Sequence, residues 1–328
     1  MIYRQLLYIA LCLVLCSCQT KTKTTPADVR CAFSADSAYT YIAQQLVFGP
    51  RVPGTEAHEA CGDWLVSELA RHGAQVKSQY GTMTNYAGKA QDIRNIVAIL
   101  EGNTPHAILL CAHWDCRPWS DEEERYEDRF EPVMGANDGA SGVGVILEMV
   151  RQMAIRKSKG EFIPTVQVVF FDCEDMGTPA HFTGSQRDHT WCLGSQYWAQ
   201  ELKIQNSKFK INYGILLDMV GDPSATFPRE YFSMQYAGNY VERLWREASK
   251  LGYGRYFVQQ VTYYPITDDH YYVNTIAGIP CVDIIDYKTN TETGFAEWWH
   301  TQHDDIQNIN KQTLQAVGET VLTTICSK

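Results

Sequence analysis

Hydrophobic residues are spaced in two ways along the chain, and the spacing predicts an alternation of helices and strands. Apolar residues three or four positions apart, as at Tyr39, Ile42 and Leu46, are typical of one face of an amphipathic helix. Short runs of β-branched and other apolar residues, such as Thr165–Val169, are typical of buried strands. The pattern predicts helices over 35–48, 55–69, 141–154, 194–202, 269–277 and 311–325, and strands over 93–100, 107–112, 165–171, 213–219 and 279–285. Strands that alternate with helices predict an α/β fold, a three-layer sandwich with helices on both faces of a mixed, mostly parallel central sheet.

The beginning of the chain resembles an export signal. Arg4 carries a positive charge and precedes an apolar stretch from Leu6 to Leu15, which is too short to span a bilayer stably. The stretch runs into Cys16-Ser17-Cys18, and this junction resembles a bacterial lipoprotein processing box with Cys18 as the lipidated residue. We therefore expect an exported protein, a periplasmic lipoprotein that contacts the membrane only through the lipid on Cys18. An ordinary secretory signal is the alternative, and it also leads to export.

The rest of the chain shows no internal repeat, no long linker and no change of composition. A polar stretch follows Cys18 and is typical of a flexible tether. The remaining length is sufficient for one large domain with its own core. The expected organisation is a signal peptide over 1–17, a tether over 18–30 and a single domain over 31–328.

Charge and cysteine content limit the possible partners and cofactors. The formal net charge of −10 argues against a nucleic-acid partner. Of the eleven cysteines, Cys12 and Cys16 fall in the signal and Cys18 is assigned to lipid, which leaves eight (11 − 3). An even number is compatible with disulfides in an exported protein, but the pairing cannot be deduced from sequence. The absence of a Cys-x-x-Cys motif argues against a structural cysteine–zinc site.

Acidic and histidine side chains occur where the predicted strands end. Each has an ordinary explanation alone, such as a helix cap or a hydrogen-bonded buried histidine. Five such positions at one edge of one sheet indicate a ligand site, because ligands gather at the carboxyl ends of strands in open α/β sheets. Carboxylates and imidazoles without thiolates suit a catalytic zinc with an open coordination position. The five positions are His113 after strand 107–112, Glu174-Asp175 after strand 165–171, Asp218 after strand 213–217, Asp138 in the turn Gly135–Gly142, and His300 near the C-terminus.

These motifs together resemble the zinc-aminopeptidase superfamily, and their order and spacing match over nearly all of residues 35–328. In this superfamily, aminopeptidases bind two zinc ions and hydrolyse an N-terminal residue. Glutaminyl cyclases, or glutaminyl-peptide cyclotransferases, use one zinc ion and convert an N-terminal glutamine to pyroglutamate. Trp299-His300-Thr301 and Asp268-Asp269-His270 resemble the cyclase motifs more closely. The resemblance therefore implies a bacterial glutaminyl cyclase, with an exported di-zinc aminopeptidase as the alternative and a non-enzymatic binding protein as a weaker one.

The resemblance also implies roles for individual residues. One zinc ion per chain would be bound by Asp138, Asp175 and His300, in a zinc-dependent catalytic domain whose substrates are peptides and proteins with N-terminal glutamine. Two positions depart from the animal cyclases, which carry Glu at the position of Asp175 and His at the position of Asp283. The remaining assignments are Glu174 as general acid/base, Asp218 and Asp268 as its hydrogen-bond network, Trp299 as a wall of the substrate pocket, and His113 with Asp218 as ligands of a second metal in the aminopeptidase alternative.

Two segments have no role assigned by these motifs. The acidic loop over 121–128 is either a solvated loop near the mouth of the site or a second metal site. The four tyrosines 263, 264, 271 and 272 are expected to lie partly in the core and partly in the pocket wall.

Overall fold

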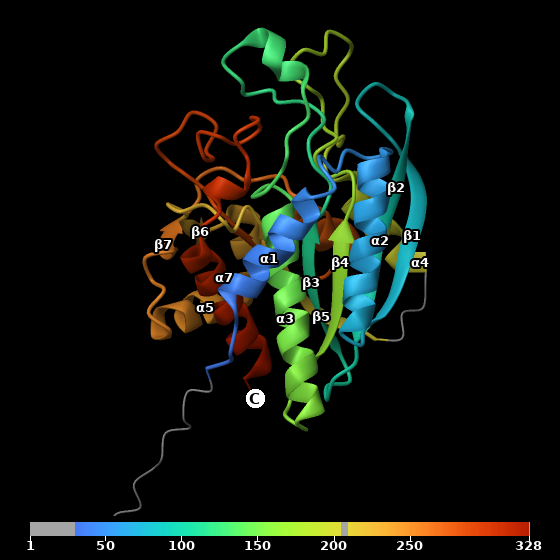
Figure 1. The fold of residues 1–328 in the computed structure, drawn as a ribbon. Coiled ribbons are helices and arrows are strands. Elements are labelled where there is room, and N and C mark those ends of the chain that lie inside the picture. Colours follow the sequence, from blue (N-terminus) through green and yellow to red (C-terminus); the bar gives the residue numbers. More distant parts are fainter. Residues whose placement is uncertain (1–29, 205–208, 328) are drawn as a thin grey trace, which may run out of the picture.

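A computed structural model describes residues 30–204 and 209–327 and shows one α/β sandwich (Figure 1). The predicted signal peptide, Cys18 and almost all of the predicted tether lie outside the described residues. Among the described helices, none has the length and apolar character needed to cross a membrane.

The central sheet has six strands in the order β1-β2-β4-β3-β5-β8. Strands β3, β4, β5 and β8 run parallel to one another, whereas β2 is antiparallel to β4 and β1 is antiparallel to β2. Every residue of β3, β4 and β8 is buried, as expected for parallel strands that are covered on both faces. The strands are β1 (Gln75–Thr84), β2 (Ala90–Leu100), β3 (Ala107–His113), β4 (Thr165–Phe171), β5 (Ile211–Asp218) and β8 (Cys281–Ile285).

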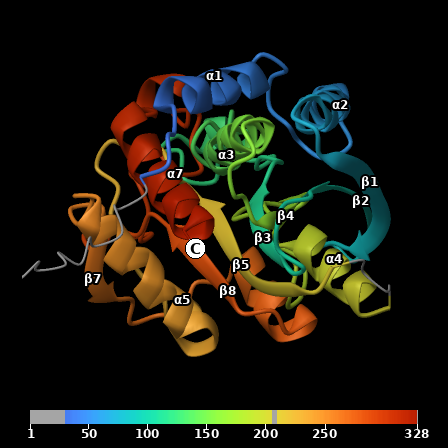
Figure 2. The ribbon, with the colours of Figure 1, turned by 90° about the horizontal axis from the view of Figure 1, so that it is seen from below.

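Helices cover both faces of the sheet, which confirms the predicted three-layer sandwich (Figure 2). The larger core lies between the sheet and α1 (Ala35–Leu46), α2 (Glu56–Arg71), α3 (Ala140–Ser158), α5 (Tyr231–Lys250) and α7 (Lys311–Cys326). On the opposite face, α4 (Leu193–Ile204) and the segment formed by α6 (Asp269–Tyr272) and a π-helical turn (Val273–Ala277) enclose the smaller core.

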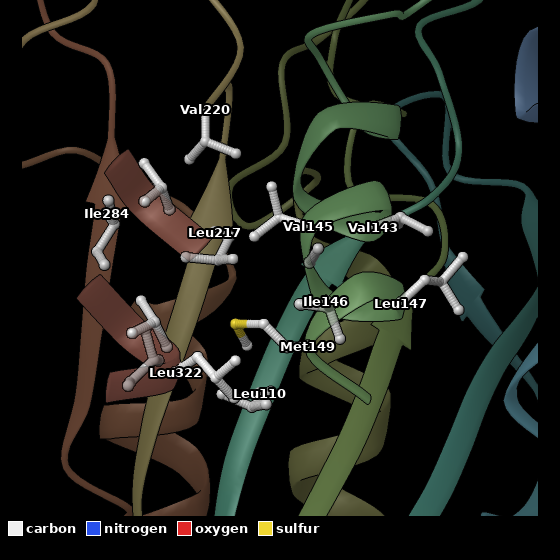
Figure 3. Close-up of a cluster of buried hydrophobic side chains, with 14 of the residues drawn as sticks. Leu110, Val143, Val145, Ile146, Leu147, Met149, Leu217, Val220, Ile284 and Leu322 are labelled. Carbon is white, nitrogen blue, oxygen red and sulfur yellow. The ribbon is translucent and has the colours of Figure 1, made fainter. Parts of the chain in front are cut away.

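The larger core explains how α3 is held over the ends of the strands. Ile146 and Met149 of α3 pack against Leu110 of β3 and Leu217 of β5, with Leu322 of α7 alongside (Figure 3). All of these side chains are almost completely buried. Since close-packed interiors tolerate little displacement, this contact fixes the N-terminus of α3 relative to the sheet.

Several elements were not predicted from the sequence. Strand β1 alternates between exposed and half-buried residues and has no continuous apolar run, because it is an edge strand. Helix α5 contains Ala237 in a non-helical conformation. The predicted helix over 269–277 forms one α-helical turn followed by the π-helical turn. The remaining short elements are the two strands β6 (Phe227–Arg229) and β7 (Phe257–Val261), which pair with each other, and the 3-10 turns Tyr126–Phe130 and Ile306–Asn308.

Candidate metal centre and active site

The predicted site residues meet at one edge of the sheet. In Figure 1 the loops that follow the parallel strands gather at the upper end of the molecule. His113 and Asp218 are the last residues of β3 and β5, and Glu174 and Asp175 follow β4. Three groups of these residues have candidate ligand atoms within 4.8 Å of one another: Asp138 with Asp175 and His300, His113 with Asp138 and Asp218, and His113 with Glu174 and Asp175.

The group formed by Asp138, Asp175 and His300 fits a zinc ion. The Nε2 atom of His300 lies 3.1 Å from Oδ1 of Asp175 and 3.4 Å from Oδ2 of Asp138. All three side chains are buried, and Oδ2 of Asp175 has no hydrogen-bond partner. A buried carboxylate oxygen without a partner is costly unless a cation or proton satisfies it. Two carboxylates and one imidazole, with room for a further ligand, are a typical catalytic zinc set.

Backbone hydrogen bonds hold the two metal-facing loops in place. Asp304 accepts hydrogen bonds from the backbone N–H groups of Asn137 (2.7 Å) and Asp138 (3.0 Å). Asp115 accepts hydrogen bonds from the N–H groups of Glu174 (3.1 Å) and Asp175 (3.2 Å). These two buried acids therefore orient the loops that carry the candidate ligands, as supporting residues of metal sites commonly do.

The N-terminal end of α3 requires glycine at two positions, one at its N-cap and one in its first turn. Gly139 has φ of +94°, and a Cβ atom there would lie 2.4 Å from the carbonyl oxygen of Asp115. A Cβ atom on Gly142 would lie 2.1 Å from the carbonyl oxygen of Leu217. The glycines therefore allow the start of α3 to approach the ends of β3 and β5, which brings Asp138 to the metal group.

Strained backbone conformations also occur around the site. Cys173, Met219 and His300 have positive φ angles of 55°, 48° and 54°. Cys173 directly precedes Glu174, and Met219 directly follows Asp218. Non-glycine residues adopt this region rarely, and surrounding contacts must stabilise it. The backbone therefore leaves the extended conformation of the strands directly beside Glu174 and Asp218.

A second group lies next to the first. Nε2 of His113 is 2.9 Å from Oδ1 of Asp138 and 3.2 Å from Oδ1 of Asp218. Burial lowers the pKa of His113, but hydrogen bonds to Asp115, Asp138 and Asp218 outweigh it and raise this pKa well above its ordinary value. The geometry thus brings together the residues that the aminopeptidase alternative assigns to a second metal.

Glu174 lies beside the metal group in a cavity of about 800 Å³. Burial, reinforced by the charge of Asp175, raises the pKa of Glu174 well above its ordinary value. The Cys192 thiol donates a hydrogen bond of 3.1 Å to Oε1 of Glu174. Burial also raises the pKa values of Asp268 and Asp218, that of Asp218 to about 7. A carboxyl group with a raised pKa can both accept and donate a proton near neutral pH.

Aromatic side chains form the wall of this cavity around His300. The imidazole ring of His300 is stacked against Trp299, with ring centroids 3.6 Å apart. Trp191 is nearly parallel to His300, with centroids 6.3 Å apart. The guanidinium of Arg117 lies 4.6 Å from the Trp191 ring centroid and donates a 2.9 Å hydrogen bond to the carbonyl oxygen of Asp175. Arg117 and Trp191 were not identified from the sequence, since nothing in their local patterns marks a position beside the site.

The position of Asp283 is explained by a neighbouring histidine. Asp283 is completely buried on β8, and its Oδ2 lies 3.4 Å from Nδ1 of His270. The other ring nitrogen of His270 lies 2.9 Å from Oε2 of Glu230. Burial and the charge of Asp268 raise the pKa of Asp283 well above its ordinary value. Asp268 is therefore backed by a buried pair, His270 from α6 and Asp283 from β8.

The two segments without an assigned role are also placed by the structure. Within residues 30–204 and 209–327, no group of potential metal ligands involves loop residues 121–128. Instead Arg117 pairs with Asp121, and Arg125 pairs with Glu127. Of the tyrosines, Tyr272 lines the cavity and Tyr271 packs on Phe232, whereas tyrosines 263 and 264 are 86% and 75% exposed. The expectation that all four would lie in the core or the pocket wall was wrong for these two, which occupy the surface loop after β7.

The metal-free protein is expected to lose stability as the pH rises from about 5 to 8. The folded state holds protons on Asp218 and Asp304, whose burial raises both pKa values to about 7, whereas unfolded aspartate titrates near 4. The folded state therefore binds more protons in this range, so the free energy of unfolding falls as pH rises. His113 and His300 act in the same direction. Their pKa values are raised in the folded state, so the stability that they contribute is lost when the pH rises above these folded-state pKa values.

Thermal unfolding in the presence of a chelator, recorded across this pH range, measures the effect. Asp218→Asn is the matched variant, since it removes one proton-binding group and should reduce the slope. Added zinc should raise the melting temperature most at pH 8, where the ligands are deprotonated. If the melting temperature of the chelated protein increased with pH, the raised pKa values assigned to Asp218 and Asp304 would be wrong.

Comparisons with known proteins identify the family of the chain. The sequence of the chain matches the family model of peptidase family M28 over residues 95–325, which are 231 of its 328 residues. The crystal structure of Tannerella forsythia glutaminyl cyclase is 46% identical, with a TM-score of 0.85, and the alignment covers 90% of this chain and 99% of that one. A structure from Parabacteroides distasonis described as a Zn-dependent exopeptidase is also 46% identical, with a TM-score of 0.84 and the same coverage.

More distant relatives fall into the same two activities. The Bacillus subtilis aminopeptidase YwaD is 27% identical over 254 residues, which are 76% of this chain and 47% of that protein. The chain thus spans about half the length of this relative. Bovine glutaminyl-peptide cyclotransferase is 21% identical over 291 residues, which cover 82% of this chain and 76% of the bovine protein. The family model and these relatives confirm the superfamily that the sequence motifs indicated: the chain belongs to peptidase family M28.

Proposed function

We propose that the chain is a zinc-dependent glutaminyl-peptide cyclotransferase, an acyltransferase that converts N-terminal glutamine of peptides and proteins to pyroglutamate and releases ammonia. The strongest support is that Glu174, Trp299 and the candidate zinc ligands all line the same cavity. The 46% identity to a bacterial glutaminyl cyclase over almost the full domain gives further support.

The proposed chemistry assigns a separate task to each part of the cavity. The α-amine of the substrate attacks the γ-amide carbon of the same glutamine, forming the ring C–N bond, and the C–N bond to the amide nitrogen then breaks. Zinc, when bound by Asp138, Asp175 and His300, would polarise the amide carbonyl. Glu174 accepts a proton from the α-ammonium group and donates it to the leaving nitrogen, which departs as ammonia, and the second proton lost by the attacking nitrogen passes to solvent. Its raised pKa suits both steps.

The shape of the cavity favours an intramolecular reaction. The indole of Trp299, stacked on the candidate ligand His300, offers a flat wall beside the metal group. A glutamine side chain folded against this wall brings its own amine and amide together, and such orientation can contribute a large part of a rate enhancement. No water molecule enters the reaction, so a second metal that generates hydroxide is unnecessary.

The aminopeptidase alternative rests on a specific observation, the second group of His113, Asp138 and Asp218. Two metals about 3.5–4 Å apart are typical of hydrolytic aminopeptidases.

The purified protein should be incubated with a glutamine-initiated peptide and a matched leucine-initiated peptide, and the masses of the products measured. Loss of the mass of ammonia from the first with no change in the second supports the cyclase. Release of the N-terminal residue from either peptide would support the aminopeptidase.

We also propose that residues 31–328 act as one catalytic domain, tethered through residues 18–30 to a lipid on Cys18 after removal of residues 1–17. The support is the sequence pattern of the first residues. The proposed location is the periplasm, with the lipid as the only membrane contact.

Cys18→Ala is expected to prevent lipidation, leaving the protein as unprocessed precursor or releasing it from membranes. Fractionation and mass spectrometry of the N-terminus measure the result. Cys16→Ala, two positions earlier and inside the predicted signal, is the control and should leave fractionation unchanged. Membrane fractionation that is the same for Cys18→Ala and the natural chain would contradict lipidation.

A further inference from the structure

Eight cysteines lie among the described residues, and all are buried. The structure contains them as thiols, and the proposed chemistry uses none of them as a reacting group. Two pairs have thiols in contact: Cys31 with Cys326, and Cys111 with Cys281. The strand positions exclude a covalent bond in the second pair.

The first pair joins the beginning of the described chain to its end. The extended segment over 30–33 runs along α7: Arg30 pairs with Glu319, and the N–H group of Cys31 donates a 3.1 Å hydrogen bond to Oγ1 of Thr323. Thr323 and Cys326 are three residues apart, so they lie on the same face of α7. The segment is therefore held in register with the last helical turn, and the Cys31 and Cys326 side chains meet in the same hydrophobic core.

The second pair cannot be bridged. Cys111 lies on β3 and Cys281 on β8, and β5 runs between these strands. The Cys281 thiol lies over Gly214 of β5, which has no side chain, and contacts the Cys111 thiol. Strands are spaced about 4.8 Å apart, so these two backbones are separated by roughly 10 Å. A disulfide requires Cα atoms within about 7 Å.

We propose that Cys31 and Cys326 form a disulfide in the mature protein, covalently fastening the segment before α1 to the C-terminal helix. In the folded protein the hydrogen bond from the Cys326 thiol lowers the pKa of Cys31 to about 7, which reflects the close approach of the two side chains. The bond forms by thiol–disulfide exchange with a small-molecule or protein disulfide. The two cysteines lose two protons and two electrons as the S–S bond forms, and the disulfide oxidant takes them up and leaves as two thiols.

This bond would close a loop over nearly the whole described domain. Cross-links stabilise mainly by restricting the unfolded chain, and the restriction is larger for longer loops. Because Cys31 and Cys326 are 0% and 4% exposed, the exchange should occur during folding, before α7 is covered. The experiment must therefore allow oxidation while the protein folds.

The test is refolding of the purified protein in a buffer of reduced and oxidised glutathione, followed by alkylation in denaturant and mass spectrometry without reduction. The protein should carry two fewer alkyl groups than a sample that is fully reduced before alkylation, and the peptide map should contain one cross-linked pair, Cys31 with Cys326. Cys111 and Cys281 should both be recovered as alkylated thiols, although their side chains also touch. The oxidised form should melt about 5 °C or more above the reduced form.

Cys326→Ser is the matched variant, since it keeps the size of the side chain and removes the bond. It should fold, carry the same number of alkyl groups with and without prior reduction, and melt at the same temperature with and without reductant. Recovery of Cys31 and Cys326 as separate alkylated thiols from the natural chain after oxidative refolding would overturn the proposal. A cross-link between Cys31 and any other cysteine would overturn it equally.

Discussion

Replacing Glu174 with glutamine is expected to lower kcat by roughly a hundredfold to ten-thousandfold while zinc remains bound. Glutamine has the size of glutamate but cannot exchange the proton that the cyclisation requires. Glu174 is adjacent to Asp175, yet only Asp175 belongs to the group with Asp138 and His300. If Glu174 transfers a proton and does not bind zinc, its replacement should lower turnover and leave the zinc content unchanged.

Turnover of a glutamine-initiated peptide and zinc content per chain should be measured on the same preparation. Glu124→Gln is the matched control, because it makes the same chemical change at an exposed carboxylate of the acidic loop. That control should retain the turnover of the natural chain. Near-normal turnover of Glu174→Gln would show that another group transfers the proton, and loss of zinc from it would show that Glu174 is a metal ligand.

Removing the metal is expected to abolish turnover, and Asp175→Asn should have nearly the same effect. The asparagine cannot supply the negative charge of the carboxylate, and we expect zinc affinity to fall by at least about a hundredfold. Asp188→Asn makes the same change at an exposed residue that lines the same cavity, and it should keep both zinc and activity. Dialysis against a chelator followed by metal analysis and assay gives the measurement.

The stoichiometry of the active protein distinguishes the two M28 activities. One zinc ion per chain, with activity restored by one equivalent after chelation, is expected for the cyclase. A requirement for two equivalents would indicate that His113 and Asp218 bind a second metal, as the geometry of that group allows. Activity that survives complete removal of zinc would contradict the proposed mechanism.

Local sequence patterns determined the architecture and the positions of the main site residues. Buried parallel strands require continuous apolar runs, so β3, β4, β5 and β8 were recognisable, as was their alternation with helices. The acids and histidines near the strand ends indicated a ligand site at one edge of the sheet, and the resemblance implied which of them would bind zinc and that Glu174 would be the general acid/base. Strand β1 was not recognisable, since an edge strand with one weakly buried face needs no such run.

Tertiary structure alone decided how the site is supported. Asp304 contacts the backbone of Asp138 from 166 residues away, and Arg117 reaches the carbonyl oxygen of Asp175 across 58 residues. The histidine beside Asp283 comes from position 270, and Cys31 meets Cys326 only because α7 returns beside the segment before α1. None of these contacts leaves a periodic or local trace in the sequence. They arise because elements that are distant along the chain pack against each other. That packing depends on the complete hydrophobic core, so no single segment of the sequence reveals it.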